Sequence, residues 1–432
     1  MPCATSRPAG PRTDPARRRE PLIPRRADWL SRDITLLLSG RALRSLSQGY
    51  LGVVVPVYLA RLGFSATRVG LVFTAGAVGS IVLTASVGLL ADRIGRKPLL
   101  ITLGVLTSVA TLAFALTQRY SILLIAAACG TIGRGGGAGS SGAFGPYYPA
   151  EQPLITEKVS DSARTHVFGL VAVVGVLSGA AGALLATLPT LMQRWFGVPL
   201  ANGDRGLFLA SSVIGVCMAL VILPVHEAPR RSATSGHRRL QPGTTRVLWR
   251  FMITNATNGL AVGMLGPVLV YWFHVRFGAT AAQLGTLYFA ANILAAPSNL
   301  MAGRVAKRFG TVRSVVGLRF TAVALMAVMA LVPAFWMAAV LFLARTQVNT
   351  MSNPMRQSFL MGIVDPADRS TAAGFSNLPL QVLSSAGPTI AGQIMQTVWV
   401  SLPLELAAGL QAVNATLYHL FFHTMRLPEE EV

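Results

Sequence analysis

Long apolar runs recur along almost the whole chain and are separated by short polar segments. Each run is close to the about 20 residues that an α-helix needs to cross the hydrocarbon core of a bilayer. Inside a bilayer the backbone must satisfy its own hydrogen bonds, which restricts spanning segments to helices and closed barrels. The lengths of the runs favour helices, so the sequence predicts an all-α, polytopic membrane protein.

The apolar runs predict twelve transmembrane helices. We place them approximately at 34–60, 67–89, 98–117, 121–146, 165–190, 206–224, 250–274, 281–302, 314–332, 335–355, 370–398 and 402–425. The longest polar interruption divides them into six and six. The expected organisation is a basic, disordered cytoplasmic tail (1–32), a six-helix bundle (33–225), a cytoplasmic linker (226–249), a second six-helix bundle (250–426) and a short tail (427–432).

Composition and charge placement support a membrane protein. Apolar residues make up 52% of the chain and charged residues 12%, whereas soluble domains carry about 25% charged residues. The formal net charge is +21, but the basic residues lie in short segments between apolar runs. That placement indicates loops retained on one side of a membrane rather than nucleic-acid binding. We therefore expect both termini in the cytoplasm and a cell (inner or plasma) membrane location.

The chain offers no pattern for a metal, a cofactor or an enzyme active site. Its three cysteines, Cys3, Cys129 and Cys217, are isolated from one another, so we expect neither a disulfide framework nor a metal site. A Walker-type phosphate loop is absent, which disfavours an ATP-driven pump. We expect no cofactor and no enzymatic activity.

A charged turn between the second and third apolar runs carries the most specific motif. Residues 88–97 read Gly-Leu-Leu-Ala-Asp-Arg-Ile-Gly-Arg-Lys. This stretch resembles motif A of the major facilitator superfamily, the loop between transmembrane helices 2 and 3. The resemblance implies two pseudo-symmetric six-helix bundles around a central cavity, and a secondary active transporter that works by alternating access. We expect a monomer, in a lipid bilayer, with a small-molecule substrate.

The two halves of the chain repeat, as this resemblance requires. The pattern of residues 88–95 recurs at 303–310, with Lys307 in place of the acid. Pro149 and Gln152 recur as Pro354 and Gln357 in a constant register. The same register puts Arg356 where the first half has Glu151.

The resemblance implies a gating role for the first copy of the motif. Asp92 would cap the cytoplasmic start of helix 11 near 369–371, where a carboxylate opposes the positive end of the helix dipole. Arg96 would pair with Glu151, and Arg164 could join that cluster. The full gating set is Gly88, Asp92, Arg93, Gly95, Arg96, Glu151 and Arg164. The alternative is that these residues only anchor the loop and set the topology.

Polar residues within helix 1 are the first candidates for substrate binding. Arg41, Arg44 and Gln48 share one helical face because they are spaced by three and four. Arg44 lies about 15 Å from the helix start, close to mid-membrane. When Gly49 is aligned with Gly263, Arg41 and Arg44 fall on Asn255 and Asn258 of helix 7. The alternative for Arg41 is that its side chain snorkels to the cytoplasm.

Helices 4 and 10 add further candidates. Arg134 precedes a glycine-rich run that resembles motif B of the same superfamily, and the alternative is a structural arginine bonded to carbonyls. Arg345 and Asn349 share a face of helix 10. The complete predicted substrate set is Arg44, Arg134, Arg41, Gln48, Asn255, Asn258, Arg345 and Asn349.

The acidic residues all lie at predicted helix ends or in loops, which leaves the expected cavity positive and free of acid. Because buried positive charge is costly unless it meets negative charge, the preferred hypothesis is transport of a small anion. Proton-coupled efflux of drugs or metabolites is a second hypothesis, although the Gly-Pro antiporter signature is missing from helix 5 and a version of it lies at 387–392. A non-transporting sensor is a third. Whether a proton is coupled to transport stays open.

Overall fold

The computed structural model describes residues 31–130, 132, 145–159, 161–227, 242–364 and 369–425. Within those ranges the chain forms helices joined by turns, and no strand. The helices are α2 (Arg32–Arg61), α3 (Ala66–Ile94), α4 (Arg96–Leu116), α5 (Tyr120–Gly130), α6 (Tyr148–Glu157), α7 (Asp161–Leu185), α8 (Leu188–Phe196), α9 (Leu200–Ile222), α10 (Pro242–Phe277), α11 (Ala281–Phe309), α12 (Thr311–Leu331), α13 (Phe335–Ile363), α14 (Arg369–Thr397) and α15 (Leu402–Phe422).

The predicted all-α membrane architecture is confirmed, and the predicted spans fall on these helices. In the described part of the chain, six helical segments are long and apolar enough to cross a membrane: Ala66–Ala91, Arg96–Leu116, Val167–Phe196, Leu200–Ile222, Thr245–Phe277 and Thr311–Leu331. Other predicted spans, such as those on α2 and α13, contain arginines that lower their hydropathy. Most of the predicted span 121–146 lies outside the described residues beyond α5.

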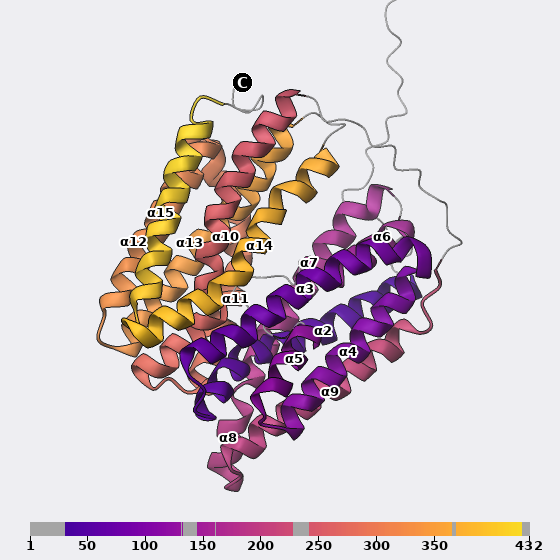
Figure 1. The fold of residues 1–432 in the computed structure, drawn as a ribbon. Coiled ribbons are helices and arrows are strands. Elements are labelled where there is room, and N and C mark those ends of the chain that lie inside the picture. Colours follow the sequence, from indigo (N-terminus) through magenta and orange to yellow (C-terminus); the bar gives the residue numbers. More distant parts are fainter. Residues whose placement is uncertain are drawn as a thin grey trace, which may run out of the picture.

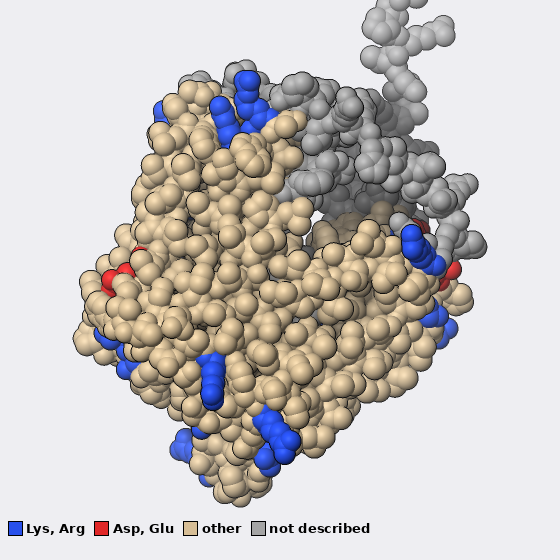
Figure 2. All heavy atoms as spheres, in the orientation of Figure 1, with Lys and Arg blue, Asp and Glu red and all other residues tan. Residues whose placement is uncertain are grey.

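The helices form two groups that meet at one end and diverge at the other (Figure 1). One group is α2 to α9 and the other is α10 to α15. We call the end at which α15 terminates the upper end, and the end that carries α8 the lower end. The surface is hollowed between the two groups toward the upper end (Figure 2).

The hydrophobic cores follow the same division. One large core cluster joins the two groups and includes residues of α2, α3, α10, α11 and α14. Two further clusters are separate from it and from each other. One is built around Leu100 and Leu154 in the first group, and the other around Phe251 and Phe359 in the second. The halves therefore share a core at the lower end, whereas each has a core of its own toward the upper end.

Matching glycines make the tight turns of the repeated motif. Gly95 joins α3 to α4 with φ of 105°, and Gly310 joins α11 to α12 with φ of 80°. Side chains with a Cβ rarely adopt these positive φ values, so glycine lets each helix pair reverse direction at a single residue. The repeat seen in the sequence thus corresponds to the same turn in both halves.

The outward surface is that of a protein surrounded by lipid. Large apolar side chains are exposed on the outer helices, including Val109, Ile125, Val213 and Leu300. Lysines and arginines lie mainly toward the two ends, with a broad uncharged surface between them (Figure 2). Exposed apolar patches of this extent mark contact with a membrane rather than with water.

Candidate functional site

A buried ion triad occupies the interior of the first half. Arg41 and Arg44 of α2 and Glu151 of α6 are each no more than 5% exposed. Nη1 of Arg41 donates to Oε1 of Glu151 at 3.1 Å, and Nη2 of Arg44 donates to Oε2 at 2.8 Å. The guanidinium of Arg44 also lies over the ring of Tyr147, 4.5 Å from its centre. One carboxylate therefore bridges the two arginines that the sequence predicts on one helical face.

This triad corrects two expectations. The predicted pairing of Arg96 with Glu151 is wrong, because Arg96 instead pairs with Glu157 at the end of α6. The expectation of an interior free of acid is also wrong. Glu151 lies in the first turn of α6, from which its side chain reaches inward to α2 rather than outward to the loop. Arg41 does not snorkel to the surface, since its side chain is 2% exposed.

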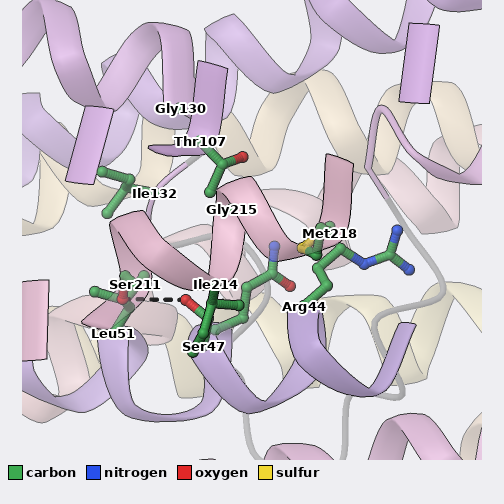
Figure 3. Close-up of a pocket in the computed structure, with 11 residues that line it drawn as sticks. Arg44, Ser47, Leu51, Thr107, Gly130, Ile132, Ser211, Ile214, Gly215 and Met218 are labelled. Atoms are coloured by element: carbon green, nitrogen blue, oxygen red, sulfur yellow. Dashed lines mark hydrogen bonds between the residues drawn. The ribbon is translucent and has the colours of Figure 1, made fainter. Parts of the chain in front are cut away.

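A small pocket lies beside the triad in the first half (Figure 3). Arg44 and Gln48 line it together with residues of α4 and α9, but the guanidinium of Arg44 points away from the rest of the lining. Ser47 and Ser211 are hydrogen-bonded across it at 3.1 Å. Its volume of about 10 Å³ has room for about one water molecule. The pocket brings two predicted residues together, yet it is too small for a solute in this conformation.

The second half has a different polar network at the matching place. Arg356 of α13 donates to Oδ1 of Asn255 on α10, and Nδ2 of Asn255 donates to the carbonyl of Ser376 at 2.7 Å. Arg319 of α12 donates to Oδ1 of Asn258 at 3.0 Å and also to Oδ1 of Asn414 on α15. The predicted residues Asn255 and Asn258 are thus brought together as acceptors for two arginines.

Arg319 and Arg356 were not predicted as site residues. Both are buried, and Arg356 also lies over the ring of Tyr418 at 5.8 Å. The signal for Arg319 was present in the sequence, because a single arginine within the apolar run 314–332 requires a polar partner. The signal for Arg356 was its position in the repeat, opposite Glu151.

Arg345 is buried and forms no ion pair with a described carboxylate. It is 7% exposed, and its Nε has no hydrogen-bond partner among the described residues. The hydroxyl of Tyr288 on α11 interacts with it electrostatically. Asn349, one turn further along α13, is half-buried. The predicted pair therefore lies on the same helix, with only the arginine fully enclosed.

The residues around the charged turn form a network at the upper end. The backbone N–H groups of Arg96 and Lys97 donate to the carboxylate of Glu227 at 2.8 and 3.2 Å, which caps the start of α4. Nearby, Lys158 donates to Asp33, and this hydrogen bond holds the pKa of the Asp33 carboxyl below its ordinary value. These contacts tie α2, α4 and α6 together within the first half.

Some predicted gating and binding residues lie where the structure gives no side-chain description. These are Asp92 and Arg164, whose helices are described but whose side chains are not, and Arg134, which lies outside the described residues altogether. The end of α3 and the start of α14, which the Asp92 latch would join, diverge at the upper end (Figure 1). The latch therefore stays a prediction.

The lower end is closed by a seam between the halves. A Cβ added to Gly70 of α3 would meet the carbonyl oxygen of Pro388 at 2.2 Å, and one added to Gly392 of α14 would meet that of Ala66 at 2.3 Å. Thr389 donates to Thr74 across the same seam at 2.7 Å. The antiporter-like segment 387–392 therefore lies at this contact, where its glycine lets two backbones touch.

The equivalent helices of the opposite halves make a second part of the seam. A Cβ on Gly285 at the start of α11 would lie 2.4 Å from the carbonyl oxygen of Ala183 at the end of α7. The close contacts between halves thus lie at the lower end, while the cores separate toward the upper end. Among the described residues, the two halves are therefore joined at the lower end and have separate cores toward the upper end.

The sequence matches the family described as Major Facilitator Superfamily over residues 37–388 and 251–431. The chain belongs to the major facilitator superfamily. Its relatives include an uncharacterized membrane protein, YJR124C, of Saccharomyces cerevisiae, 23% identical over 397 residues that cover 84% of this chain and 88% of the relative. Another is the quinolone resistance protein NorA of Staphylococcus aureus strain MRSA252, 23% identical over 400 residues, with 90% and 96% covered.

Solved structures share the superfamily fold. A bacterial homolog of the human lysosomal transporter Spinster, in an inward-facing and occupied conformation, gives a TM-score of 0.72 at 16% identity, covering 91% of this chain and 96% of that one. The nucleoside transporter NupG gives 0.70 at 12% identity, covering 90% of this chain and 99% of that one. Membership of the superfamily makes this chain a multi-pass membrane transport protein.

Proposed function

We propose that this superfamily member is a secondary active transporter that carries a small anion by alternating access. The observation that carries the proposal is the charge of its interior. Five arginines are buried in the described residues (Arg41, Arg44, Arg319, Arg345 and Arg356), against two buried carboxylates, Glu151 and Asp204. Asp204 is already paired with Arg61, at 2.7 Å. The bundle interior is therefore strongly positive.

Buried positive charge is stable only when hydrogen bonds or negative charges compensate it. In the first half, Glu151 compensates Arg41 and Arg44 in part. In the second half, Arg319 and Arg356 have neutral amide partners, and no described acidic side chain forms an ion pair with either of them or with Arg345. An anion that enters the space between the halves meets a field that favours it, whereas a cation meets one that opposes it.

The predicted substrate set is part of this proposal. Arg44 and Gln48 would act from the first half, and Asn255, Asn258, Arg345 and Asn349 from the second. Arg41 and Arg134 complete the set. The buried, amide-bonded Arg319 and Arg356 add to the positive field without being proposed as ligands.

We also propose the orientation. The upper end, which carries the basic turn 88–97, would face the cytoplasm by the positive-inside rule. Both termini and the linker between the six-helix halves would then be cytoplasmic, in a cell (inner or plasma) membrane. The described conformation would be the inward-open one, and the protein would act as a monomer.

The first experiment is thermal unfolding of the detergent-purified protein in the presence of inorganic anions, carboxylates, sugars, amino acids and lipophilic cations. A ligand at 100 times its dissociation constant adds about 2.7 kcal/mol to the apparent stability. We expect a shift with an anion, and we expect Arg345→Gln to remove it. Arg276→Gln is the matched control, because it makes the same charge change at an exposed arginine outside the interior.

An anion-induced stabilisation that persists in Arg345→Gln but is lost in Arg44→Ala would place the binding site in the first half. The substrate would still be an anion. A shift with lipophilic cations alone would contradict the anion proposal. It would favour the second candidate, proton-coupled efflux.

The efflux candidate is supported by the similarity to NorA over 90% of this chain. The buried carboxylate of Glu151 gives such an exchanger a group that could carry a proton. Its test is export of a fluorescent lipophilic cation from proteoliposomes when a pH gradient is imposed. Export that depends on the pH gradient would establish this candidate, and gradient-independent leakage would dismiss it.

A further inference from the structure

The nine-residue helix α8 (Leu188–Phe196) lies at the lower tip of the first half (Figure 1), and most of its apolar face is exposed. Leu188, Leu191, Met192 and Trp195 follow the spacing of three and four that places them on one side of a helix. Leu188, Met192 and Trp195 are 39%, 40% and 70% exposed. Thr190 and Arg194 lie on the other side.

A close contact with α9 holds α8 against the first half. Pro189 packs against Gly203 of α9, where an added Cβ would lie 2.8 Å from the Cα of Pro189. Gly197, with φ of 67°, then reverses the chain into α9. The helix is therefore held in place while Leu188, Met192 and Trp195 on its apolar side stay exposed in the described structure.

The length of the segment puts α8 at the edge of the membrane. Residues Val167–Phe196 include 30 positions, which would extend about 45 Å as a straight helix. The hydrocarbon core is only about 30 Å thick. If α7 crosses the core, α8 must lie near the boundary between hydrocarbon and water.

The surroundings of α8 indicate that lipid covers its exposed apolar side. The two helices that α8 connects both carry exposed apolar residues along their length, such as Leu177 on α7 and Val213 on α9, so the apolar side of α8 continues a lipid-facing surface. Trp195 and Phe196 are the residue types enriched at membrane interfaces, and a neighbouring arginine suits lipid phosphates. Basic side chains gather around this lower tip (Figure 2).

We propose that α8 is an interfacial helix whose stripe of Leu188, Leu191, Met192 and Trp195 is inserted into the lipid leaflet at the lower end, with Arg194 at the headgroups. The anchor goes beyond the proposed transport function and does not depend on which solute is carried. It would hold the junction of α7 and α9 at one depth, next to the seam at Ala183, while the halves move.

The test places an environment-sensitive fluorophore at two positions of the full-length protein in lipid nanodiscs. In a background with Cys3, Cys129 and Cys217 changed to serine, Met192→Cys labels the apolar side and Gln193→Cys, at an exposed polar position, is the matched control. We expect the label at 192 to emit at shorter wavelength and to be quenched by lipids brominated near the headgroup. The label at 193 should report water.

Three outcomes would overturn the proposal. Water-like emission at both positions would mean that α8 stands clear of the bilayer. Equal quenching at both, strongest with bromines near the bilayer centre, would mean that α8 is part of the transmembrane span. Disulfide crosslinking between Met192→Cys chains, together with loss of lipid quenching in doubly occupied discs, would mean that a second copy covers this face.

Discussion

The two halves place opposite charges at equivalent positions. In the first half, two arginines on α2 meet a glutamate on α6, whereas in the second half one asparagine on α10, Asn255, meets an arginine on α13. The register that aligns Pro149 with Pro354 also aligns Glu151 with Arg356. The repeat has thus kept a polar contact between equivalent helices, with the sign of the charge reversed at Glu151 and Arg356 and with neutral asparagines in place of the two arginines of α2.

This difference separates two kinds of buried arginine. Arg41 and Arg44 share the carboxylate of Glu151. The stability of these two buried charges therefore depends on one group, which an anionic ligand can displace or a proton can neutralise. Arg319 and Arg356 are held by amide oxygens, which cannot be neutralised by a proton. The buried network of the first half is therefore the more sensitive to protonation or to a bound anion. The network of the second half keeps its positive charge.

Glu151→Gln should have the largest effect on stability. It removes the charge of the carboxylate that pairs with both buried arginines, and breaking a buried ion pair in this way costs about 3 to 5 kcal/mol. The measurement is the unfolding midpoint of the detergent-purified protein. Replacing the whole triad by methionine should recover most of the loss, because apolar residues of similar volume can substitute for a buried ion cluster. Wild-type stability in Glu151→Gln would mean that the arginines rely on other partners.

Substitutions at the two turn glycines test a feature in which the halves should behave alike. Gly95→Ala and Gly310→Ala each force a Cβ into a backbone conformation that is nearly restricted to glycine, at a cost of about 1 to 3 kcal/mol. We expect similar losses in the thermal unfolding of the two variants, because the turns are the same and only the charges around them differ. A much larger loss for Gly95→Ala would show that the polar network at Glu227 and Glu157 adds strain to the first turn.

Arg356→Met should be milder than the change at Glu151, although it also removes a buried charge. It leaves Asn255 without a donor but relieves an uncompensated positive charge, so we expect a net change of about 1 kcal/mol or less. The unfolding midpoint measures it, and Arg356→Lys is the control that keeps the charge and loses the planar donor. A loss as large as that of Glu151→Gln would refute the distinction between the halves.

The fold could be predicted from the sequence because a backbone inside a membrane must satisfy its own hydrogen bonds. Apolar runs of spanning length must be helices, and Gly95 and Gly310 mark their sharpest turns. The predicted ranges accordingly fall on α2–α5, α7 and α9–α15, although most of 121–146 lies outside the described residues. The short α8 was missed, because its apolar face extends the run that ends α7 and resembles the end of one long span.

The interior contacts were harder to predict because they depend on packing between helices far apart in sequence. Glu151 follows the predicted end of its span, so the sequence indicated a loop acid, and only the position of α6 brings it to Arg41 and Arg44. The repeat did predict that Asn255 and Asn258 occupy equivalent places. It could not show that Arg319, from a third helix, donates to Asn258.

The smallest effect is expected at the rim of the first half. Arg96 and Glu157 form an ion pair whose side chains are 23% and 41% exposed, and exposed pairs contribute about 0 to 1 kcal/mol. The repeat places Gly362 opposite Glu157, so the second half has no equivalent pair. Glu157→Gln should change the unfolding midpoint little, and raising the salt concentration should remove what remains. If it instead destabilised the protein as much as Glu151→Gln, the charge at the rim would matter as much as the charge in the core. The contrast between the halves would then concern their surfaces rather than their interiors.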